Sequence, residues 1–126
     1  MVVKTKNFDP ATDVKLLCTC GHESCDERSV RQVVLNRAQL VRDVVGPLEI
    51  RSGGRCPYHP DEIHRETPAD HQLQNAVDVG VTGWNRGKVV KTGIEVGFNA
   101  IGVAKTFVHL GYRADLQGRD IVMWIY

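Results

Sequence analysis

Two histidines and one aspartate have side-chain types and positions that could do chemistry. Asp78 and His109 each stand between two aliphatic residues, and His71 precedes Asp78 by seven positions. A carboxylate or imidazole in an apolar strand needs a partner, because burying it unpaired is costly. Taken singly, the ordinary interpretations are a loop histidine, a turn or edge carboxylate, and a core histidine with one satisfied nitrogen.

Taken together, His71, Asp78 and His109 form the set of two imidazoles and one carboxylate that is typical of catalytic zinc sites. Three protein ligands leave a fourth position for water. Zinc there lowers the pKa of water to about 7 and polarises a carbonyl group. The residue types therefore predict one Zn²⁺ ion held by these three side chains.

Four cysteines form a second group of candidates. Cys18, Cys20 and Cys25 lie within eight positions, with His22 among them, and Cys56 follows later. In a chain without a secretory signal, structural disulfides are not expected, so buried thiols are the favoured interpretation. A second zinc site that includes His22 is the alternative, although these ligands are packed more tightly than in common structural sites. A third interpretation is a metal or redox protein centred on this cluster.

The elements that must position these residues follow from apolar spacing and turn signals. Together they predict an α+β domain, with helices against a small antiparallel sheet. The expected helices are 25–45 and 84–98, the expected strands are 48–51, 76–79, 105–112 and 120–126, and 56–70 is expected to be a long exposed loop.

Composition limits the classes of function. A chain of 126 residues fits a single domain, assigned to 4–126. Its formal net charge of +1 gives no electrostatic footprint for nucleic acid. No apolar run approaches the roughly 18 residues that a membrane-spanning helix needs. The first ten residues have no apolar core behind their lysines, so we expect synthesis in the cytoplasm without a signal peptide.

The order of the three ligands resembles the zinc D-alanyl-D-alanine carboxypeptidases and L-alanyl-D-glutamate peptidases. These enzymes share a fold with lysostaphin-type enzymes and the hedgehog signalling domain. The family signature is Ser-x-His-x-x-Gly-x-Ala-x-Asp. His71, Ala76 and Asp78 match it, whereas Ala69 and Gln74 stand at its Ser and Gly positions.

Other segments are similar to the same family, so the resemblance covers nearly the whole chain. Residues 51–57 are similar to its Ser-Gly-Tyr-Arg segment, and 97–103 followed by 107–109 to its Gly-Ile-Gly and Phe-Val-His passage. The closing residues 123–126 are similar to its aromatic C-terminal strand.

This resemblance implies a hedgehog/DD-peptidase-like zinc fold, with zinc on His71, Asp78 and His109. It implies that Arg55 contacts a substrate carboxylate or carbonyl, for which the planar guanidinium is suited. The implied function is a zinc metallopeptidase that hydrolyses the peptidoglycan stem peptide, as a D-Ala-D-Ala carboxypeptidase or an endopeptidase. Small size and the missing signal suggest a phage or prophage product that reaches the cell wall after release or within a virion.

The sequence does not identify a general base. The family commonly has a carboxylate or imidazole shortly before the last ligand, where this chain has Thr106 and Phe107, and some phage relatives have Asp at the position of Gly111. These departures favour an alternative: a non-catalytic zinc-binding structural or wall-binding protein of the same fold, for example a phage tail component. The remaining titratable candidates are His59, Glu62, His64, Glu95 and Asp70, the last of which could instead be a helix cap.

Overall fold

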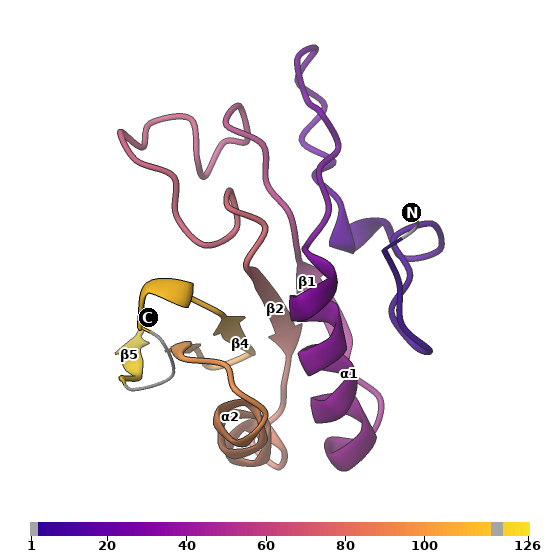
Figure 1. Ribbon diagram of the computed structural model, residues 1–126, viewed down its shortest axis with the longest axis vertical. Helices are drawn as coiled ribbons and strands as arrows, with labels where there is room; N and C mark the ends of the chain where they lie inside the picture. Colours follow the sequence, from indigo (N-terminus) through magenta and orange to yellow (C-terminus); the bar gives the residue numbers. More distant parts are fainter. Residues whose placement is uncertain (1–2, 117–119) are drawn as a thin grey trace.

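The computed structural model describes residues 3–116 and 120–126, and in them the chain forms an α+β domain with two α-helices and one five-stranded sheet (Figure 1). Its elements in chain order are the 3-10 helix η1 (Val14–Leu16), α1 (Gln32–Val45), β1 (Glu49–Ser52), β2 (Ala76–Gly80), α2 (Arg86–Glu95), β3 (Ala100–Val103), β4 (Phe107–Gly111), the 3-10 helix η2 (Ala114–Leu116) and β5 (Val122–Ile125).

The sheet has the strand order β1-β2-β4-β3-β5. Its first three pairings are antiparallel, but β3 and β5 are parallel, so the sheet is mixed and the expectation of an antiparallel sheet is wrong at this edge. The reason lies in the end of the sheet at which β5 begins. Because β3 and β4 are antiparallel, β4 ends at Gly111 beside Ala100, where β3 begins. β5 begins at the same end of the sheet, with Val122 beside Ala100, so it runs in the direction of β3.

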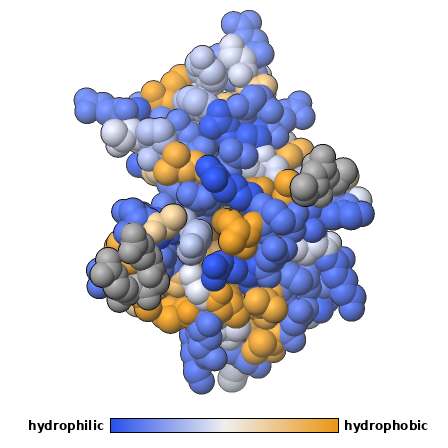
Figure 2. All heavy atoms as spheres, in the orientation of Figure 1, coloured by the Kyte–Doolittle hydropathy of each residue, from blue (hydrophilic) through white to orange (hydrophobic). Residues whose placement is uncertain are grey.

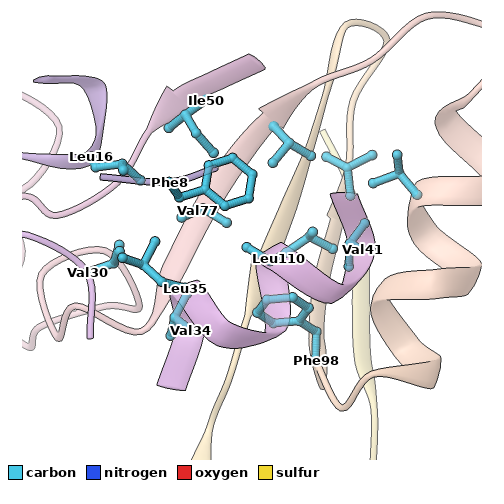
Figure 3. Packing of buried hydrophobic residues seen from close by; sticks show 14 of the residues in the cluster. Phe8, Leu16, Val30, Val34, Leu35, Val41, Ile50, Val77, Phe98 and Leu110 are labelled. Atoms are coloured by element: carbon cyan, nitrogen blue, oxygen red, sulfur yellow. The ribbon is translucent and has the colours of Figure 1, made fainter. Parts of the chain in front are cut away.

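The hydrophobic core lies between one face of the sheet and the two helices (Figure 3). Alternation along a strand sends successive side chains to opposite faces. Val77 of β2 and Leu110 of β4 accordingly point into the core, where Leu35 of α1 and Phe98 pack near them. Their neighbours Asp78 and His109 therefore belong to the face of the sheet away from the helices.

Helix α1 is shorter than the sequence predicts. It begins at Gln32 rather than at residue 25, because the preceding segment pairs with the chain near η1 through a bridge between Leu17 and Ser29. Glu27 in that segment has a φ of 52°, which no right-handed helix contains. The predicted end is confirmed: Gly46 has a φ of 103°, and its N–H donates to the Arg42 carbonyl at 2.8 Å.

The other predicted helix and the four predicted strands are confirmed within a few residues. Strand β3 was not predicted from the sequence. The long segment between β1 and β2 has no helix or strand and lies at the same end of the molecule as the segment 17–29 (Figure 1). In the matching space-filling view, hydrophobic side chains are most visible in the lower half, near α1 and α2 (Figure 2). Within the described residues, no helix has the length and apolar character needed to cross a membrane.

Candidate metal centre

One row of cross-strand neighbours builds the floor of the site. Asp78 of β2 is the direct partner of His109 of β4, and His109 is the partner of Gly102 of β3. Ser52 of β1 and Trp124 of β5 extend this row on either side. Because directly opposed positions on a sheet share a face, the strand register alone brings the aspartate and the histidine together.

His71 reaches the site from the turn before β2. Its Nδ1 lies 2.7 Å from the carbonyl oxygen of Gly53, which can only accept, so Nδ1 carries a proton and donates. The ring thereby turns Nε2 toward Asp78, whose Oδ1 lies 3.1 Å away. This hydrogen bond fixes both the orientation and the tautomer of His71, as carbonyl oxygens do for metal-binding histidines.

His109 is held between two carboxylates. Its Nδ1 lies 3.1 Å from Oδ1 of Asp78, and its Nε2 lies 2.9 Å from Oδ2 of Asp70. Asp70 is fixed in turn by Arg113, whose Nε and Nη2 donate to its two oxygens at 2.8 and 3.0 Å. The result is a chain of contacts from guanidinium to carboxylate to imidazole that ends at the oxygen of Asp78.

The three sequence-predicted ligands thus converge, and they form a group that could hold a metal ion. One ligand atom of each of His71, Asp78 and His109 lies within 4.8 Å of the others. Oδ1 of Asp78 is equally close to both imidazoles, so the three donor atoms face a common point. All three side chains are buried, with between 4% and 7% of each residue exposed.

The charges of this group are strongly coupled. Burial tends to raise the pKa of Asp70, but hydrogen bonds from His109 and Arg113 outweigh it and lower that pKa to about 2. Burial acts on Asp78 in the same way, and the two histidines outweigh it, so the pKa of Asp78 also lies below its usual range. Burial opposes the charged form of His109, yet the two carboxylates raise its pKa. In the absence of a metal ion, a proton on His109 therefore supplies the positive charge that balances the two carboxylates.

A pocket of about 600 Å³ opens over the three residues. Arg55 stands in its wall, where Nη2 lies 3.5 Å from Oδ2 of Asp78 and Nε donates to the Ser52 hydroxyl at 3.1 Å. The opposite wall is aromatic: Trp124 lies against His109, with ring centroids 5.0 Å apart. The remaining lining residues are Asp61, Glu62, His64, Arg65, Ala69, Asp70, Phe107, Arg113 and Tyr126.

Two glycines leave space for these side chains. A Cβ on Gly102 would lie 2.6 Å from the indole nitrogen of Trp124, so only glycine lets the indole cross β3 at this point. A Cβ on Gly111 would lie 3.0 Å from Nε2 of His109, the atom that contacts Asp70. A side chain at position 111 would therefore crowd the nitrogen of His109 that contacts Asp70.

The structure also sorts the candidates for a general base. Glu62, His64 and Asp70 line the pocket, whereas His59 and Glu95 are not among its lining residues. Asp70 is not a helix cap, since no helix begins there, and both of its oxygens already hold Arg113 or His109.

Sequence reasoning missed the roles of Arg113, Gly53 and Trp124. Arg113 lies only four residues after His109, but its partner Asp70 is 43 positions away, so their pairing has no local signal. Trp124 lies on a later strand, and Gly53 acts through a backbone carbonyl that carries no side-chain signal. Comparisons with protein-family models, with curated proteins and with solved structures find no match for this chain.

Proposed function

We propose that this protein is a zinc-dependent hydrolase that cleaves an amide bond in the stem peptide of peptidoglycan, as a D-Ala-D-Ala carboxypeptidase or an endopeptidase. The observation that carries this proposal is the convergence of Nε2 of His71, Oδ1 of Asp78 and Nδ1 of His109 beneath an open pocket. Two nitrogens and one oxygen match the three-ligand pattern of catalytic zinc, whereas structural sites use four protein ligands.

The residues present fit that metal. In each histidine, the ring nitrogen that faces away from Asp78 donates its N–H to a fixed acceptor. Nδ1 of His71 donates to the carbonyl of Gly53, and Nε2 of His109 donates to Asp70, as the second nitrogen of metal-binding histidines does. When bound, zinc would lower the pKa of water and polarise the carbonyl of the scissile amide. The resemblance of the ligand order to the carboxypeptidase family supports the same metal and suggests the hedgehog/DD-peptidase-like fold.

Arg55 is suited to orient a carboxylate of the substrate. Its side chain is 16% exposed, and its acidic neighbours Asp61, Glu62 and Asp78 lie at 3.5 to 4.0 Å rather than at short hydrogen-bond distances. A carboxylate that enters the pocket can replace the exposed Asp61 at Nη2 and form a closer ion pair. Stem peptides carry such carboxylates at their ends and on their acidic residue.

Glu62 is the group that we infer to act as general base. Its side chain is 1% exposed, and Oε2 faces the guanidinium groups of Arg55 and Arg65 at 3.5 and 3.4 Å. Oε1 has no hydrogen-bond partner among the described residues, although it is buried in the pocket wall. A buried acceptor without a partner is rare. Oε1 can take a proton from the attacking water and pass it to the leaving amine.

The test is a digest of whole peptidoglycan, with released fragments identified by mass spectrometry. New amino termini that disappear in Asp78→Ala support the hydrolase and identify the bond. Glu62→Gln should keep its zinc and lose roughly 10²- to 10⁴-fold in rate, the usual contribution of a general base. Glu66→Gln is the matched control, since Glu66 lies in the same loop but is exposed and should hydrolyse at the wild-type rate.

An unchanged digest across several wall types, from protein that contains zinc, would refute the hydrolase. It would favour the non-catalytic zinc-binding or wall-binding protein, which the absence of a base at Thr106, Phe107 and Gly111 also favours. Sedimentation of the protein with purified cell walls would then measure that second function. In either case we propose action on the wall after release from the cell or as part of a virion.

A further inference from the structure

The four cysteines come together at a place away from the pocket just described. Cys18, Cys20 and Cys25 belong to the segment 17–29, and Cys56 follows β1. All four are free thiols, and their sulfur atoms lie within 4.8 Å of one another. The sulfur atoms of Cys20 and Cys56 are 3.6 Å apart. The sulfur atoms thus join two segments that are far apart in sequence.

This spacing is that of a tetrahedral metal site. With Zn–S bonds of about 2.3 Å, the sulfurs of a four-thiolate zinc site lie about 3.8 Å apart along each tetrahedral edge. The 3.6 Å between Cys20 and Cys56 is close to that edge, and none of the separations exceeds 4.8 Å. A disulfide would need sulfurs about 2 Å apart. The cluster therefore fits four sulfur ligands around one metal ion better than it fits two disulfide bonds.

Backbone N–H groups face the sulfur atoms. The N–H of Glu27 donates to the sulfur of Cys25 at 3.4 Å. The N–H groups of His22 and Tyr58, each two residues after a cysteine, act in the same way on Cys20 and Cys56. Such donors stabilise negative charge on sulfur, and they leave the side of each sulfur that faces the cluster for a cation.

His22 does not complete the set. Its ring stacks on Tyr58, with centroids 4.4 Å apart and planes at 10°, and its Nδ1 accepts from the N–H of Ser24 at 3.0 Å. His22 is also not among the residues whose ligand atoms lie within 4.8 Å of one another. Four thiolates from Cys18, Cys20, Cys25 and Cys56 remain.

We propose that these four cysteines bind one structural zinc ion. Four thiolates around a tetrahedral ion select zinc or iron, and zinc is the ion that closed four-ligand structural sites use. Binding releases the thiol protons to solvent, so the site fills more readily as pH rises. The four protein ligands leave no open position for water, so this second site does not catalyse.

The zinc would fix the segment that serves the first site. Gly54 donates its N–H to the carbonyl of Leu16 at 3.1 Å, and a Cβ on Gly54 would lie 2.1 Å from the carbonyl oxygen of Arg28. The glycine is thus inserted tightly against the cysteine-bearing segment. Its neighbours Gly53 and Arg55 supply the carbonyl that orients His71 and the guanidinium in the pocket wall. The cysteine site therefore anchors the chain from β1 to the pocket.

Metal content tests the proposal directly. Protein purified with a reducing agent and without chelators should contain two zinc ions per chain. Cys20→Ser should contain one and His109→Ala should contain one, because each variant loses a different site. His22→Ala is the matched control and should retain both. A His109→Ala protein that contains no zinc would overturn the cysteine site, whereas the same protein with one zinc leaves it standing even if the proposed hydrolase fails.

Cobalt substitution provides a second measurement on the wild-type chain, in case a cysteine variant fails to fold. Cobalt bound by four thiolates gives intense sulfur-to-metal charge-transfer absorption, and imidazole and carboxylate ligands do not. That absorption should be present in wild type and in His109→Ala. Its absence from both, iron in place of zinc, or an intact mass that shows a disulfide between cysteines of the freshly purified protein would overturn the proposal.

Discussion

Replacement of Asp70 by asparagine tests whether the second carboxylate positions a metal ligand. Asparagine has the same size and keeps an acceptor for Nε2 of His109, but it loses the charge and one of the two oxygens that hold Arg113. Partners of this kind usually contribute 10- to 100-fold to metal affinity. We therefore expect Asp70→Asn to bind zinc at the His71 site 10- to 100-fold more weakly, which is about 1.4 to 2.7 kcal/mol.

The pKa of Asp70 gives an independent magnitude. It falls from its usual 3.8 to about 2 through His109 and Arg113, against the effect of burial. Each pKa unit corresponds to about 1.4 kcal/mol, so the charged carboxylate contributes about 2 kcal/mol to folding. Because the folded-state pKa is the lower one, this contribution is complete above about pH 4 and is lost as the pH falls through 2. In chelated protein, the unfolding free energies of wild type and Asp70→Asn should converge over that range.

The assay is competition for zinc against a chromophoric chelator, with the site assigned by parallel titration of His109→Ala. Asp61→Asn is the matched control. Asp61 lines the same pocket, but its side chain is 64% exposed and its nearest cation, Arg55, is 4.0 Å away. Equal affinities for wild type and Asp70→Asn, or a loss no larger than that of Asp61→Asn, would refute the reasoning that Asp70 acts through His109.

Three further predictions follow from the same geometry. Gly111→Ala should weaken zinc binding, because its Cβ would meet Nε2 of His109 at 3.0 Å, whereas Gly87→Ala, with no atom within 4 Å, should leave it unchanged in the same titration. Apparent zinc affinity should fall as the pH drops below the raised pKa of His109, because a proton then competes for its ring; a flat profile from pH 8 to 5 would contradict this. Leu35→Ala should lower the urea-unfolding free energy by about 2 to 5 kcal/mol, since Leu35 is fully buried in the core.

The shared face of Asp78 and His109 in the candidate metal site could be predicted from the sequence, because strand periodicity carries the information. Asp78 and His109 alternate with core valines and leucines, so each had to lie on the face away from the core. Which strands would be neighbours could not be predicted in the same way. The pairing of β2 with β4 depends on long-range register, which no local pattern encodes. The residue types predicted which side chains could form the candidate site, and the pairing of β2 with β4 brings Asp78 and His109 together.

Gln74 shows how a departure from the family signature can be interpreted physically. It stands where the signature has glycine, and in the structure its φ is 65°, in the left-handed region that glycine adopts most easily. Its side chain donates to the carbonyl of Ser29 at 2.8 Å, and its own carbonyl accepts from Arg31 at 2.9 Å. The backbone conformation at this position is therefore one that glycine adopts most easily, although the residue is glutamine.

The start of α1 was mispredicted because tertiary contacts, two of them made by cysteines, set the conformation of residues 25–31. Asp26, Glu27 and Ser29 are residue types that favour a helix start, and the apolar spacing of the helix begins at Val30, so the sequence predicted a helix from residue 25. The conformation of the segment is instead set by contacts with the chain near η1, among them the N–H of Cys18 donating to the carbonyl of Arg28 at 3.0 Å and the sulfur of Cys25 donating to the carbonyl of Cys18 at 3.5 Å. Tertiary pairing overrides helix propensity there. A sequence pattern could not distinguish a helical turn from a segment shaped by these tertiary contacts.

The long segment 53–75 links the two candidate metal sites, and its order needs an explanation. Long segments without helix or strand are uncommon in compact domains, because ordering each residue costs about 1 to 2 kcal/mol of conformational entropy. This segment is held at its start by Cys56, in its middle by the contacts of Glu62 with two arginines, and at its end by His71 on Gly53. Two of those three attachments involve residues that we propose to bind zinc. A structural zinc ion contributes its binding free energy to folding. Zinc at the two sites would therefore hold this segment in one conformation, in addition to any role in the chemistry of the pocket.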